Sequence, residues 1–233
     1  MMTKTILYSS LLCLYGMLVM VGSAQEADKK GLVCTALALE PLKEKELYYR
    51  DGKKLLPFTY KKAKRGPELA LSVPTSKFEL YRKGEEGVDG RPSYEMVGSC
   101  DLPGGTKSVF LLVTNAREGA ERSILIKAYD DSLTGFPPGS MRFANFSQQN
   151  LKVEINGKES PIRRGALTVV KVRAPQDGGY VPVTFYNSAM EEVHFTKMYS
   201  QSRARKLVFI TSTTNARRPF KFSFITENLS LAD

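Results

Sequence analysis

Short apolar runs separated by turn residues recur along almost the whole chain. In one of the clearest runs, Leu151, Val153 and Ile155 alternate with charged residues and share one face of an extended strand. The dipeptides Asp51-Gly52 and Asn156-Gly157 are two-residue hairpin signals of the type I′ kind. No stretch places apolar residues at helical spacing over several turns, so the pattern predicts an all-β protein.

The pattern is also repeated. The tetrapeptide Thr114–Arg117 occurs again as Thr214–Arg217, each time between two apolar runs. A hairpin glycine and a basic turn that ends in Arg-Gly (Arg65-Gly66 and Arg164-Gly165) precede both copies in the same order. Corresponding landmarks lie about 100 residues apart, which indicates an internal duplication.

Each copy has enough short strands for an antiparallel β-sandwich of immunoglobulin-like size. The chain has no Trp, so the buried core Trp of true immunoglobulin domains is missing. The predicted organisation is a signal peptide (1–24), a linker (25–31), a first β-sandwich domain (32–131), a Pro/Gly linker (132–139), a second β-sandwich domain (140–228) and a tail (229–233).

Two apolar runs do not alternate. Val109–Val113 and Leu207–Ile210 are continuous, which is typical of a strand covered on both faces. We therefore expect the two copies to pack on each other, with a homodimer surface as the less favoured alternative. Phe136, in the Pro/Gly linker, is expected to be docked on the protein.

The first 24 residues have the layout of a secretory signal peptide. Lys4 precedes an apolar stretch, Ile6–Val21, and Gly22-Ser23-Ala24 supplies the small residues of a cleavage site. We expect cleavage near Ala24 and export to the periplasm, the cell envelope or the exterior. An uncleaved anchor is the alternative, because this segment is long enough for a membrane span. No second apolar run has that length, so the mature protein is expected to have no transmembrane span.

Two cysteines, Cys34 and Cys100, remain after cleavage. Export permits a disulfide between them. A bridge that closes so long a loop would stabilise the fold by roughly 4 kcal/mol. Two free, buried thiols are the equally open alternative.

The chain is basic, with 34 Lys and Arg against 24 Asp and Glu. This balance favours anionic partners. In an exported protein these would be acidic polysaccharide, other envelope glycans or lipid head groups, and nucleic acid is not expected. Solvated turns are the plainer interpretation. The candidate anion-binding residues are Lys61, Lys62, Lys64, Arg65, Arg163, Arg164, Arg203 and Arg205.

No arrangement of residues predicts a reaction, a metal site or a cofactor. The chain has one histidine, His194, which excludes a His-rich zinc cluster. Alternation with Val193 and Phe195 predicts that His194 faces solvent. The acidic pairs Asp130-Asp131 and Glu191-Glu192 are the candidates for glycoside hydrolysis, although turn and edge positions explain both.

One segment resembles a known pattern. Gly135–Ser147, followed by Val153–Lys158, is similar to a Pro-Gly loop, Arg-Phe strand and Asn-Gly hairpin that recur in exported bacterial β-sandwich proteins of unassigned function. The resemblance implies a bacterial, exported β-sandwich and carries over no catalytic residue. The general form also resembles periplasmic pilus chaperones, at the level of shape alone, and their basic anchoring pair has no counterpart here.

These observations predict a non-enzymatic exported binding or structural protein of the cell envelope. Its partner would be anionic glycan, a membrane surface or another protein. A periplasmic chaperone or assembly factor is one alternative, and a glycan-acting hydrolase that uses an acid pair is the other.

Overall fold

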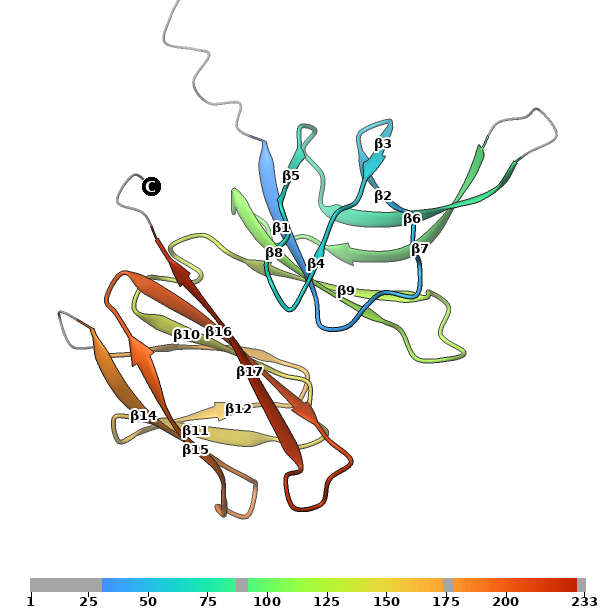
Figure 1. The fold of residues 1–233 in the computed structure, drawn as a ribbon. Coiled ribbons are helices and arrows are strands. Elements are labelled where there is room, and N and C mark those ends of the chain that lie inside the picture. The colour runs from blue at the N-terminus through green and yellow to red at the C-terminus, as the bar shows by residue number, and fades with distance from the viewer. Residues whose placement is uncertain (1–30, 87–91, 174–177, 230–233) are drawn as a thin grey trace, which may run out of the picture.

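The computed structural model describes residues 31–86, 92–173 and 178–229. This part of the chain forms 17 strands in four sheets and contains no helix, which confirms the all-β prediction (Figure 1). The predicted signal peptide, most of the 25–31 linker and residues 230–233 of the tail lie outside the described residues.

The N-terminal half forms two sheets that enclose one core. Its strands are β1 (Leu32–Ala38), β2 (Leu47–Asp51), β3 (Lys54–Pro57), β4 (Lys61–Lys62), β5 (Glu68–Leu71), β6 (Lys77–Glu86), β7 (Pro92–Asp101), β8 (Ser108–Asn115) and β9 (Ile124–Asp130). One sheet has the order β4-β1-β8-β9, with β5 also paired to β1, and the other has the order β3-β2-β6-β7. Side chains from both sheets, such as Leu111 and Phe78, meet in the core between them.

The C-terminal half repeats this arrangement. Its strands are β10 (Ser140–Asn145), β11 (Leu151–Ile155), β12 (Lys158–Ile162), β13 (Leu167–Lys171), β14 (Gly179–Tyr186), β15 (Glu192–Ser200), β16 (Ala204–Ser212) and β17 (Phe220–Asn228). The sheet orders are β13-β10-β16-β17 and β12-β11-β14-β15. β10 is parallel to β16 and antiparallel to β13, as β1 is parallel to β8 and antiparallel to β5. The order and sense of pairing are therefore the same in both halves.

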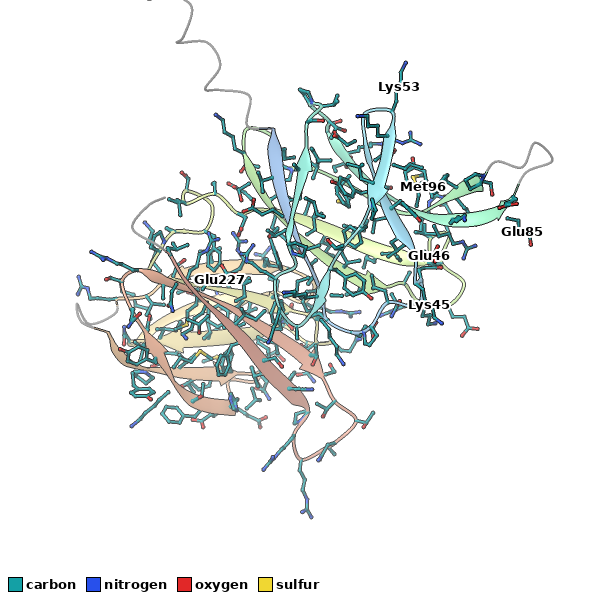
Figure 2. All side chains as sticks on the ribbon, turned by 45° about the horizontal axis from the view of Figure 1, so that its top comes forward. Lys45, Glu46, Lys53, Glu85, Met96 and Glu227 are labelled. Atoms are coloured by element: carbon teal, nitrogen blue, oxygen red, sulfur yellow. The ribbon has the colours of Figure 1, made fainter. Side chains whose placement is uncertain are left out.

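The two predicted hairpins differ in detail. Asn156 and Gly157 both have positive φ and form the turn between β11 and β12, as a type I′ turn requires. In the other hairpin Asp51 pairs with Lys54, so the turn residues are Gly52 and Lys53, one position later than predicted. Asp51 is instead held by Ser72, whose backbone N–H donates to its carboxylate over 3.0 Å. Figure 2 shows Lys53 at the tip of this hairpin.

The continuous apolar runs lie where the two halves meet. Val109 and Leu111 point into the core of the N-terminal half, whereas Phe110 and Leu112 point toward the C-terminal half. The second run divides in the same way, and Leu207 and Phe209 form the inter-half cluster with Phe110, Leu112, Leu37, Ala144 and Phe136. The predicted packing of the two halves on each other is confirmed, and Phe136 is fully buried in the cluster between them.

Candidate functional site

Two of the predicted anion-binding residues, Arg65 and Arg205, lie in an ion network between the two halves. Asp131 accepts a hydrogen bond from Arg65 over 2.7 Å and one from Arg205 over 3.2 Å, and Arg142 lies 3.5 Å away. Glu227, at the end of β17, binds both Arg65 and Arg205. Figure 2 labels Glu227 on the side of the C-terminal half that faces the N-terminal half. Arg65 therefore joins the halves directly.

Aromatic rings complete this network. The Arg65 guanidinium lies 4.8 Å from the centre of the Phe110 ring, and Phe136 lies 4.2 Å from Arg142 and 4.9 Å from Arg205. Burial, with the repulsion of the neighbouring arginines, lowers the pKa of Arg142 to about 10. The Arg142 guanidinium is therefore charged at neutral pH, and the carboxylates of Asp131 and Glu227 lie among the three arginines. The role of Arg65 and Arg205 in the structure is to hold the two halves together.

The other candidate basic residues are exposed and dispersed. Lys61 and Lys62 form β4, which lies at one end of the strand order β4-β1-β8-β9. Arg163 and Arg164 lie in a turn beside the opposite edge, because Lys127 of β9 donates to the carbonyl oxygen of Gly165 over 2.8 Å. The two basic turns therefore do not form one patch. Lys64 and Arg203 are also exposed, and anion binding by these six residues stays a prediction.

The acidic pairs have separate partners. Asp130 accepts hydrogen bonds from Thr106 over 2.7 Å and from the backbone of Ser132 over 2.9 Å, whereas Asp131 faces the arginines. Glu191 accepts a bond from Asn187 within its own turn. None of these contacts places two carboxylates on either side of a cleft, as glycoside hydrolysis requires.

Both cysteines belong to the N-terminal core and are free thiols. Cys34 is fully buried on β1, and Cys100 of β7 packs partly buried against the same cluster. Burial raises the pKa of each thiol to about 12, with a smaller contribution from nearby negative charge. At neutral pH they are protonated core residues, not nucleophiles.

An open groove of about 830 Å³ runs between β15 and β17, each of which is an edge strand of one sheet of the C-terminal half. His194 of β15 stacks on Phe222 of β17 with ring centres 4.3 Å apart and an angle of 12°. Phe220 and Phe224 continue the apolar lining along β17. The prediction that His194 faces solvent was wrong, because its two apolar neighbours do not both point inward. Phe195 is 49% exposed on the outer face, and a β-bulge at Val193 interrupts the alternation just before His194. Burial lowers the pKa of His194, so its imidazole is neutral at pH 7.

Most polar residues of the groove come from the turn between β16 and β17, which contains the second copy of the repeated tetrapeptide. The others are His194 and Thr196 of β15 and Lys221 of β17. Arg217 and Arg218 lie in this turn, and Lys221 is the second residue of β17. Asn215 shapes the turn by accepting a hydrogen bond from the backbone of Arg217 over 2.9 Å. One end of the groove is therefore basic. Sequence reasoning missed this site, because its lining comes from strands of two different sheets, whose juxtaposition the local pattern does not show.

In the N-terminal half the corresponding strands, β7 and β9, are in close contact at Gly98. Gly98 pairs with Leu80 just before a bulge at Val97, and His194 pairs with Phe185 just before a bulge at Val193. Gly98 and His194 therefore occupy equivalent positions. Gly98 allows β7 to pack closely on β9, whereas the imidazole of His194 stands between β15 and β17.

No protein-family model and no curated protein matches the chain. Within residues 31–86, 92–173 and 178–229, no group of three or more His, Cys, Asp or Glu side chains could hold a metal ion. In the same ranges no helix has the length and apolarity to cross a membrane. The candidate site thus rests on the geometry of the groove.

Proposed function

We propose that this is a non-enzymatic exported binding protein of the cell envelope, and that it engages another protein through the groove between β15 and β17. In this proposal the chain consists of a signal peptide and two β-sandwich domains of immunoglobulin-like size related by internal duplication. The shared order and sense of strand pairing in the two halves supports the duplication. The N-terminal sequence pattern supports export.

The observation that carries the proposal is the exposure of core-type side chains in the groove. Phe224 lies on the inner face of its sheet, opposite the fully buried Val208 in the strand register, yet it is 60% exposed. An exposed apolar site of this kind, with a polar rim, is typical of an interaction surface. The dispersed basic turns, in contrast, give no concentrated surface for a polyanion.

The fixed relation between the halves supports a binding role. Leu207 and Phe209 cover the N-terminal half through one face of β16, while the other face carries the core behind the groove. The network around Asp131 adds directional bonds to this packing. The N-terminal half thereby serves as a rigid base that presents the groove to the partner.

The test places a photoreactive amino acid at position 224 of the full chain and, as a matched control, at position 125. Leu125 is a similarly exposed apolar residue on β9, 51% exposed, in the other half. We expect cross-linking in the producing cells to join an envelope protein to position 224 and not to position 125. Binding that requires Arg163 and Arg164 but ignores position 224 would favour an anionic glycan or membrane surface instead.

A further inference from the structure

We propose that the groove accepts an extended polypeptide segment as an added strand on β17, with acidic residues of that segment beside the β16–β17 turn. The inference rests on the proposed function and specifies the chemistry of the partner. It follows from three features of the groove: free strand edges, a partly exposed apolar face and a basic end.

The strand edges are free in the described part of the chain. β17 pairs with β16 along its whole length, and no described strand pairs with its other edge. β15 pairs in the same way with β14 alone among the described strands. Each therefore presents unpaired backbone N–H and C=O groups along the groove, and such an edge is a template for another strand.

The apolar face has the spacing that a strand requires. Phe220, Phe222 and Phe224 point to the same side of β17 at intervals of two residues. A strand laid beside them would direct every second side chain toward Met198 and His194 on the other wall. In the N-terminal half β7 and β9 are in contact at Gly98, whereas here the imidazole of His194 stands between β15 and β17. The expected segment alternates apolar and polar residues.

The charged residues of the groove favour a bound segment of opposite charge. Arg217, Arg218 and Lys221 gather at the end where β17 begins, and no Asp or Glu belongs to the described lining. An antiparallel added strand, the commoner arrangement, would place its C-terminal part at this end. We therefore expect acidic residues toward the C-terminal end of the bound segment.

An acyl chain or a sugar is the competing occupant. Either could contact the phenylalanine rings, but neither would form a regular ladder of hydrogen bonds with the free edge of β17. Backbone pairing is thus the property that separates a polypeptide from the other ligands, and the experiment measures it directly.

The experiment selects peptides from a random phage-displayed library on the full chain purified after export, with counter-selection on the Phe224→Glu variant. We expect enrichment of alternating sequences that carry Asp or Glu near the C-terminal end. On binding, amide hydrogen exchange should slow at β17 and not at β9. A synthetic copy of the selected peptide with methylated backbone nitrogens should lose binding.

Matched variants test the two recognition features. The Arg217→Ala/Arg218→Ala variant should bind the selected peptide about tenfold more weakly than the unchanged protein does. The Arg163→Ala/Arg164→Ala and Leu125→Glu variants should bind it with unchanged affinity. Strand addition would be overturned if the peptide with methylated backbone nitrogens still bound. It would also be overturned if palmitate vesicles abolished peptide binding by occupying the groove. Failure to select any peptide while position 224 still cross-links to an envelope protein would overturn this inference and leave the proposed function standing.

Discussion

Gly98 on β7 lies so close to Ile124 on β9 that a Cβ atom at position 98 would be 2.9 Å from the carbonyl oxygen of Ile124. This contact closes one side of the N-terminal half. The equivalent position in the C-terminal half carries His194, and the corresponding side is the open groove. The tightly packed edge of one sandwich thus has glycine at the position where the open edge of the other has histidine.

Replacing Gly98 with Ala should destabilise the protein by about 1–3 kcal/mol, because the added methyl group meets backbone that cannot turn away. Gly104→Ala is the matched control, since a Cβ atom there meets nothing within 4 Å. The control should change stability by no more than about 0.5 kcal/mol. Urea unfolding of both variants measures the difference, and equal midpoints would show that β7 and β9 are not tightly apposed.

Replacing Asp131 with Asn should destabilise the protein by about 3–5 kcal/mol, because it leaves the buried guanidiniums of Arg65, Arg142 and Arg205 without their shared carboxylate. The control is Glu159→Gln, which breaks an exposed pair with Lys152 and should cost at most about 1 kcal/mol. Denaturant titration gives both values. A loss for Asp131→Asn as small as that of the control would mean that the network does not stabilise the interface.

His194 should make stability depend on pH. Burial lowers its folded-state pKa below the ordinary value of 6.5, so the folded protein binds fewer protons than the unfolded chain. The stability from the neutral imidazole is present above pH 6.5 and is lost as pH falls through the folded-state pKa. Subtracting the profile of His194→Gln from that of the wild type isolates this contribution. A difference that stays constant from pH 7.5 to pH 5 would exclude it.

The two core thiols should be unreactive while the protein is folded. A rise of the pKa from 9.0 to about 12 lowers the thiolate population at neutral pH by about a thousandfold. Iodoacetamide should therefore label Cys34 and Cys100 very slowly in buffer and rapidly in denaturant. Peptide mass spectrometry measures the extent of labelling at each cysteine. If both cysteines resist labelling in denaturant until a reductant is added, the exported protein contains the disulfide instead.

Much of the architecture could be read from local pattern. Continuous apolarity in Val109–Val113 marked a strand with two covered faces, and the structure assigns its alternate residues to two different cores. The hairpin at Asn156-Gly157 was also predictable, because its positive φ angles suit these residues. The alternation around His194 gave the wrong face, because Phe195 lies on the exposed side of the strand and the bulge at Val193 is not evident from the sequence.

The sequence by itself determined the class of the fold, the repeated order of strands and the mutual packing of the two halves, because each depends on the periodicity of apolar residues along one strand or turn. Only the tertiary structure decided the site. The partners of Arg65 are Asp131 and Glu227, far along the chain, and the groove pairs His194 with Phe222 from different sheets. Whether a basic or aromatic residue is buried, paired or open to a ligand depends on its tertiary contacts. The local sequence pattern carries no information about those contacts.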